Sequence, residues 1–290
     1  MHAGSAATAL PGVAVGRLKY GTGVERPIHA DFVVPDTTLP RSGIDAARLL
    51  ALAVLVIAGL WAWDAPWLAP LRLLVVLVHE TGHALATLLF GGRVERVIVG
   101  ADESGQCLSA LPAGWLPQIA VYSAGYVGSA VSGALQLVLA FRFRLHRPVL
   151  YAMGAWVTAM GLVYAGNGFT LGYCLAMGAV LLVLARVLPP AAARALVTLI
   201  AVFTGLYALF DLRDDLWRPG GGGPSDAVLL AARTHVPALI WSFLWSVGSV
   251  AVLALAAWVS LRRARPSPED ALEAVRSAAA SGMRRTTPHP

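Results

Sequence analysis

The fold is decided by the stretch Leu73-Leu-Val-Val-Leu-Val-His79-Glu80-Thr81-Gly82-His83-Ala-Leu-Ala-Thr-Leu-Leu-Phe90. It sets a His-Glu-x-x-His motif inside an otherwise apolar run. Positions i and i+4 of a helix share one face, so His79 and His83 can present their imidazoles to one divalent ion while Glu80 holds a water beside it. Ionisable side chains at membrane depth are costly and are usually retained for function or paired. The stretch therefore predicts a zinc hydrolase site on a membrane-spanning helix, the alternative being two buried histidines satisfied by hydrogen bonds.

The composition agrees with an integral membrane protein. Of 290 residues, 57% are hydrophobic and only 13% are charged, and the mean hydropathy is +0.68. Soluble domains carry about 25% charged residues. We expect an all-α, polytopic transmembrane helix bundle of about seven spans, or six if one run is re-entrant. The apolar runs lie at about 46–63, 69–90, 117–141, 149–166, 168–188, 193–212 and 237–261.

We place the transmembrane bundle at 44–261 and expect the segments on either side of it to be tails. Residues 1–43 lack a basic n-region and have their mild apolar run broken by Pro11, so we expect a disordered tail rather than a signal peptide. Residues 262–290 form a C-terminal tail in which Ser267-Pro268 starts a short surface helix. The formal net charge of +6 comes from arginines that cluster at span ends, where they anchor to lipid headgroups. No aromatic-interleaved basic motif suggests nucleic-acid binding.

A small β-hairpin is predicted directly after the metal-binding helix. The pair Gly91-Gly92 ends the helix, and the partly alternating, β-branched stretch 94–99 is typical of a strand, with 102–105 as the turn. An exposed strand edge beside a proteolytic site could accept an extended substrate by strand addition. An ordinary surface hairpin is the alternative.

A catalytic zinc site typically has three protein ligands, so a further ligand must come from elsewhere in the chain. Asp211, Asp214 and Asp215 share one helical face at the end of an apolar run, where their repulsion is relieved by a cation or by a neighbouring arginine. Asp211 is the deepest and is the expected third ligand, with Asp214, Asp215 and Asp226 as alternatives. Asn167, between two glycines, is the candidate donor to the oxyanion, or else a helix-breaking turn.

The succession of motifs along the chain resembles the B-like branch of the site-2-protease family, over about residues 45–260. These proteins are intramembrane zinc metallopeptidases of bacteria, fungi and plants. The chain lacks the Asn-Pro-Asp-Gly or Leu-Asp-Gly setting that surrounds the ligand aspartate in better-studied members. The segments that carry the resemblance are His79-Glu80-x-x-His83, Gly91-Gly92, Ser123-Ala-Gly125-Tyr126-Val-Gly128, Asn167-Gly-Phe-Thr170-Leu, Asp211-x-x-Asp214-Asp215, Ser225-Asp226-Ala227 and Trp241-x-x-x-Trp245.

The resemblance implies a multi-pass protein of a bacterial cell membrane that hydrolyses peptide bonds in or near the transmembrane segments of other membrane proteins. It implies Zn²⁺ on His79 and His83, Glu80 as the catalytic carboxylate, and a distant aspartate as third ligand. Two other functions are compatible with the motif. One is an inactive relative that binds clients or regulates proteolysis, although ligation alone would not require Glu80. The other is a metal transporter, which would need polar residues on several facing spans, and the runs 149–166 and 168–188 have almost none.

Overall fold

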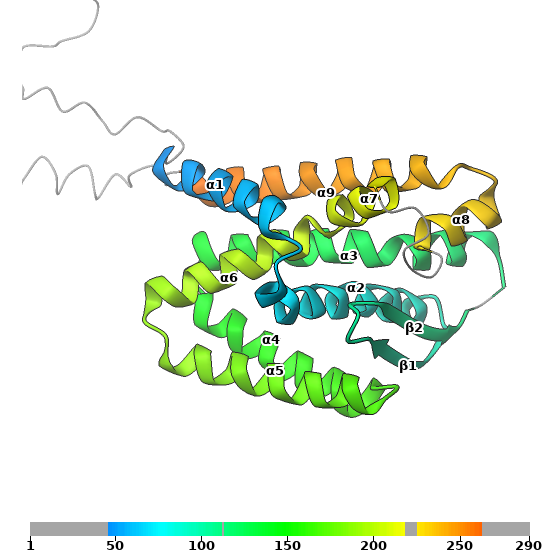
Figure 1. Ribbon diagram of the computed structural model, residues 1–290, viewed down its shortest axis with the longest axis horizontal. Coiled ribbons are helices and arrows are strands. Elements are labelled where there is room, and N and C mark those ends of the chain that lie inside the picture. The colour runs from blue at the N-terminus through cyan, green and yellow to red at the C-terminus, as the bar shows by residue number, and fades with distance from the viewer. Residues whose placement is uncertain (1–45, 112, 218–224, 263–290) are drawn as a thin grey trace, which may run out of the picture. The chain divides into compact units, whose positions relative to one another are not determined.

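A computed structural model describes residues 46–111, 113–217 and 225–262. The tail predicted at 1–43 lies outside the described residues, as does the tail predicted at 262–290, with its surface helix, except for Arg262. Within the described part, the chain forms helices and one two-stranded antiparallel sheet (Figure 1). The elements are α1 (Ala46–Ala62), the 3-10 helix η1 (Pro66–Leu68), α2 (Ala69–Leu89), β1 (Arg93–Val99), β2 (Gly105–Ala110), α3 (Trp115–Phe141), α4 (His146–Tyr164), α5 (Gly168–Val187), α6 (Pro190–Gly205), α7 (Tyr207–Trp217), α8 (Asp226–Thr234) and α9 (Ala238–Leu261).

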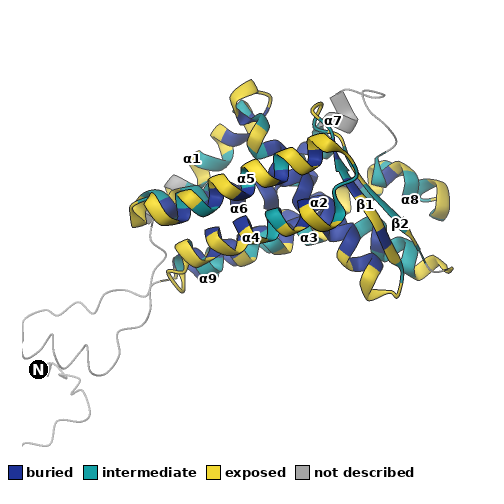
Figure 2. Cartoon of the chain, turned by 90° about the horizontal axis from the view of Figure 1, so that it is seen from below, coloured by how far each residue is buried: buried dark blue, intermediate teal, exposed yellow. Residues whose placement is uncertain are grey.

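Helix α2 is the central element of the bundle. In its apolar window 78% of the residues are buried, against 28% in α5 and in α9. Helix α3 packs between α2 and α9, while α4 and α5 pair with each other on the opposite side of α2 (Figure 1). Figure 2 shows buried residues along α2 and exposed ones on the outward faces of α5 and α9. A helix that is apolar on every side is expected inside a bundle, because each face then meets another element.

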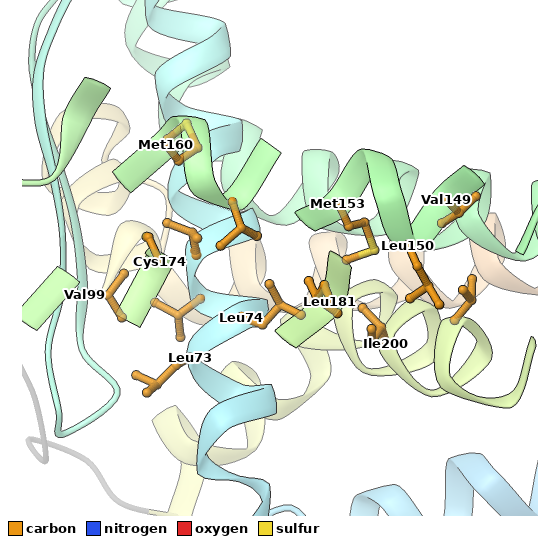
Figure 3. Packing of buried hydrophobic residues seen from close by; sticks show 14 of the residues in the cluster. Leu73, Leu74, Val99, Val149, Leu150, Met153, Met160, Cys174, Leu181 and Ile200 are labelled. Carbon is orange, nitrogen blue, oxygen red and sulfur yellow. The ribbon is translucent and has the colours of Figure 1, made fainter. Parts of the chain in front are cut away.

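The core around α2 is continuous with α4, α5 and α6. Leu73 and Leu74 of α2 belong to one buried cluster with Leu150 and Met153 of α4 and Leu181 of α5 (Figure 3). Outward-facing side chains are also apolar, which suits contact with lipid tails. On α9 these include Leu239, Phe243 and Val247, which are 55%, 58% and 51% exposed.

The span count agrees with the sequence only in part. Every predicted run contains a helix, but among the described residues only four helices are long and apolar enough to cross a membrane, namely α2 (with η1), α3, α5 and α9. The helices within Leu52–Ala62 and Pro190–Gly205 are apolar but shorter. The single helix expected over 193–212 is wrong, because α6 ends at Gly205 and α7 begins at Tyr207. Gly205 lies against the backbone of α3, where a Cβ at Gly133 would come within 2.8 Å of Gly205 N.

The β-hairpin is confirmed, and glycines place it. Gly91 has φ +78°, a left-handed conformation that suits glycine, and Gly92 N–H donates to Thr87 O at 2.8 Å, so α2 ends in a Schellman motif. Strands β1 and β2 pair antiparallel from Arg93↔Ala110 to Val99↔Gly105. The outer edge of β1 is closed by the connection between α4 and α5, because Gly166 N–H donates to Val97 O at 2.8 Å. The hairpin therefore lies beside α2 with β1 covered and β2 on the other edge.

Candidate metal centre

The three residues of the helical motif gather at one buried point of α2. His79, Glu80 and His83 are 4%, 5% and 6% exposed, and one ligand atom from each lies within 4.8 Å of the others. The i, i+4 spacing brings the two Nε2 atoms to 2.9 Å from each other. The fold therefore brings the two imidazoles and the Glu80 carboxylate close together, as the motif predicts.

Helix α3 packs so closely on α2 at this point that only glycine fits at the two contact positions. A Cβ at Gly82 of α2 would come within 2.3 Å of Ala124 O, and one at Gly125 of α3 would come within 2.4–2.6 Å of atoms of His79 and His83. Glycine at both positions lets the two backbones meet, as small residues do in packed membrane helices. The backbone of Gly125 thus forms one wall of the site.

His83 is oriented by the same helix. Its Nδ1 lies 2.7 Å from Val121 O, and a carbonyl oxygen can only accept, so Nδ1 carries the proton. In the neutral ring Nε2 then presents a lone pair to the site. A partner on the far ring nitrogen is the usual way in which a metal-binding histidine is held.

The aspartate that meets the imidazoles is Asp226, the first residue of α8. Its Oδ2 lies 2.9 Å from His79 Nε2 and 3.0 Å from His83 Nε2. The short helix is held in place by burial, since Ala227 and Leu230 are fully buried against a cluster that includes Trp245 of α9. This packing offsets the conformational entropy that is lost when Asp226 is ordered.

The donor set fits zinc. Zinc binds imidazole nitrogen at about 2.0–2.1 Å and carboxylate oxygen at about 2.0–2.2 Å. Three atoms separated by 2.9, 2.9 and 3.0 Å all lie within reach of one point at such distances. A carboxylate oxygen and ring lone pairs repel when they converge, so this arrangement requires a positive charge among them, which a proton on an imidazole or a bound metal ion supplies.

The charge state of Asp226 suits this role. Burial would raise the pKa of its carboxyl, but the charge of His83 and hydrogen bonds with the two imidazoles outweigh burial, so the pKa lies below its ordinary value. The carboxyl is therefore ionised at neutral pH, which is the form that ligates.

Asp211 and Asn167 each make a hydrogen bond with a residue outside the helical motif. The carboxylate of Asp211 accepts a hydrogen bond from the Tyr126 hydroxyl. The side chains of Asp214 and Asp215 are outside the described residues. Asn167 caps α5, where its Oδ1 accepts from Thr170 N at 2.8 Å, as in the helix-breaking turn that the sequence allowed.

Strand β2 passes next to Glu80. A Cβ at Gly105 would come within 2.3 Å of Glu80 Oε1, so only glycine leaves the carboxylate its place. Cys107 follows on the same strand, and burial together with the charge of Glu80 raises the pKa of its thiol to about 12. Cys107 and Cys174 are both free thiols.

The hairpin turn is tied to α2 by a buried arginine that sequence reasoning missed. Arg72 is 8% exposed, and its guanidinium binds both carboxylate oxygens of Glu103. It also donates to Trp63 O and, at 2.9 Å, to Ala65 O. An arginine within an apolar run was the available signal, because such a charge needs a partner.

The chain belongs to the Peptidase M50B-like family, whose model matches residues 52–256. It is therefore a membrane metallopeptidase of the site-2-protease type, and the resemblance read from the sequence is confirmed. No curated protein and no solved structure matches the chain.

Proposed function

We propose that this protein is a zinc-dependent intramembrane endopeptidase whose metal ligands are His79, His83 and Asp226. The observation that carries the proposal is the convergence of two Nε2 atoms and one carboxylate oxygen to within 3.0 Å of one another, beside a buried Glu80. Three protein ligands with one open position are typical of catalytic rather than structural zinc.

The residues of the site have two roles, which are binding of the metal ion and transfer of a proton. The two imidazoles and Asp226 hold the ion, and Val121 O keeps the tautomer of His83 that ligates through Nε2. When bound there, a zinc ion would supply a water whose pKa is lowered to about 7 and would polarise the scissile carbonyl. Glu80 takes a proton on its carboxylate and returns it to the leaving amine. Burial of Glu80 keeps bulk water away from that exchange.

The substrate enters as an extended segment along β2. The outer edge of β1 is occupied by the α4–α5 connection through Gly166 and by Thr170, whose Oγ1 accepts from Val99 N at 2.9 Å. Within the described residues no strand pairs with the other edge of β2, which passes Glu80 at Gly105. Edge strands bind extended peptides through main-chain hydrogen bonds. We infer that segments unwound from the transmembrane helices of other membrane proteins are the substrates, in a bacterial cell membrane as the resemblance implies.

The test uses the full chain in detergent or proteoliposomes with a panel of transmembrane model peptides. Removing metal with a chelator should abolish cleavage, and stoichiometric zinc should restore it. Elemental analysis should find one zinc per chain, lost in His79→Ala and His83→Ala. Equal metal content in wild type and both variants would refute the proposal. A protein that binds zinc through these residues yet cleaves no peptide in the panel, nor any protein of its own membrane, would be an inactive client-binding relative.

A further inference from the structure

We propose that Asp211 and Tyr126 form a positioning pair that fixes the imidazole of His79 for metal binding. The inference rests on the proposed function, because it assigns a task to two side chains next to one of its ligands. It gives Asp211 a role in the site without making it a ligand.

The two histidines of the motif are held in different ways. His83 is oriented by its hydrogen bond to Val121 O. In the described part of the chain, Nδ1 of His79 is buried and has no hydrogen-bond partner. His79 therefore lacks the hydrogen bond on its far ring nitrogen that orients His83, and on that side the rotation of its ring is limited by packing, because such torsions are broad when little restricts them.

Two tyrosines supply that packing. The ring centroid of Tyr126 lies 4.5 Å from that of His79 at an interplanar angle of 75°, and that of Tyr207 lies 4.8 Å away at 67°. Both contacts are edge-to-face, the geometry that aromatic quadrupoles favour. His79 is thus held by one ring from α3 and one from α7.

Tyr126 is fixed in turn by its neighbours. Its ring stacks on Trp245 with centroids 4.5 Å apart, and it is only 3% exposed. A buried phenol needs a hydrogen-bond partner, and its hydroxyl donates to Asp211. A bond to a carboxylate is stronger than one to a neutral acceptor, so it sets the angle of the ring that meets His79.

Helix α7, which starts after the break that ends α6, carries two of the side chains in this arrangement. Tyr207 and Asp211 are four residues apart on α7 and share one face of that short helix. One face of α7 therefore places the ring of Tyr207 against His79 and the carboxylate of Asp211 at the hydroxyl of Tyr126.

The experiment compares Tyr126→Phe, Asp211→Asn and Asp211→Leu in the full-length protein. Tyr122→Phe is the matched control, because it removes a hydroxyl from the same helix one turn earlier. Zinc affinity is measured by competition with a chromophoric chelator. The visible absorption spectrum of the Co²⁺-substituted protein reports the ligand geometry independently of activity, and the kinetic constants are measured on a peptide that the wild type cleaves.

We expect Tyr126→Phe and Asp211→Leu each to weaken zinc binding about 10–100-fold, the usual cost of losing a residue that orients a metal ligand. Both should alter the Co²⁺ spectrum and lower kcat while KM changes little. Asp211→Asn keeps an acceptor oxygen for the phenol, so it should stay within a few-fold of wild type, as should Tyr122→Phe. The double variant Tyr126→Phe/Asp211→Leu should be no weaker than the weaker single variant, because the two residues act through one contact.

Two outcomes would overturn the inference. Wild-type affinity and spectrum in Tyr126→Phe would show that the hydroxyl does not position His79, and this variant decides the question even if Asp211→Leu fails to fold, because the ring is retained. Loss of zinc in Asp211→Asn as severe as in Asp211→Leu, with Tyr126→Phe unaffected, would make Asp211 a ligand. Failure of the proposed function looks different, because the wild type would then bind no zinc that depends on His79 and His83.

Discussion

Oδ2 of Asp226 lies 2.9 Å from Nε2 of His79, although 147 residues separate them in the chain. The contact joins the first turn of α8 to the middle of α2. It is the long-range relationship on which the proposed three-ligand metal site depends.

Replacing Asp226 should therefore disable metal binding. Asp226→Asn removes the anionic oxygen and should weaken zinc binding by at least about 100-fold, more than the loss of an orienting neighbour. Chelator competition measures the effect. Asp64→Asn is the control, because Asp64 pairs with Arg213 at 3.0 Å and its side chain is 54% exposed. Unchanged affinity in Asp226→Asn would exclude it as a ligand.

Glu80→Gln should separate binding from chemistry. The amide keeps the size of the buried side chain but cannot accept a proton, so zinc content and melting temperature should stay close to wild type while kcat falls by about three orders of magnitude or more. Elemental analysis and peptide cleavage on the same preparation check both halves. Substantial residual cleavage would move the general base to another residue.

Gly125→Ala should block the metal site although it replaces no polar side chain. Its Cβ would meet ring atoms of both histidines within 2.6 Å, and the opposing atoms belong to packed rings that cannot give way. We expect loss of zinc and a lower melting temperature.

The control for this change is Gly172→Ala on α5, where an added Cβ meets nothing within 4 Å. It should leave both quantities unchanged or raise stability slightly. If Gly125→Ala bound zinc like the control, α3 could not be the wall of the site.

The ion pair of Arg72 with Glu103 should hold the hairpin on α2. Glu103→Gln leaves a buried guanidinium without its counter-charge, and we expect a loss of about 1–3 kcal/mol, less than for a fully buried pair because the Glu103 side chain is 28% exposed. Hydrogen exchange over residues 93–110 should rise, and KM should rise with it.

Glu95→Gln provides the comparison, because Glu95 is an exposed carboxylate on β1 of the same hairpin. It should change neither exchange nor stability. Equal exchange in the two variants would mean that the pair does not anchor the turn.

The features that the sequence predicts correctly are local ones. The spacing of His79 and His83 determines their shared face wherever the helix lies, and Gly91-Gly92 ends the helix through backbone conformations that need no distant partner. The helical bundle follows from apolar run length, but the number of spans does not, because length and hydropathy leave several runs near the threshold.

The choice of aspartate depends on packing that no local pattern records. The sequence ranks Asp211 first because it ends an apolar run, whereas the fold places its carboxylate at the hydroxyl of Tyr126, on a helix that starts after a break at Leu206. Asp226 begins α8, and the burial of Ala227 and Leu230 against distant helices holds that short helix in place. Such contacts are non-local, so the local pattern could only rank the candidates.

Because α8 carries one of the three converging donors while α2 carries the other two, binding of zinc at the proposed centre would be coupled to the docking of α8 on α2. A ligand that prefers the closed arrangement stabilises it in proportion to the logarithm of its free concentration. Zinc supply would then determine how long α8 stays docked on α2, and loss of the ion would release α8 before the helices of the bundle.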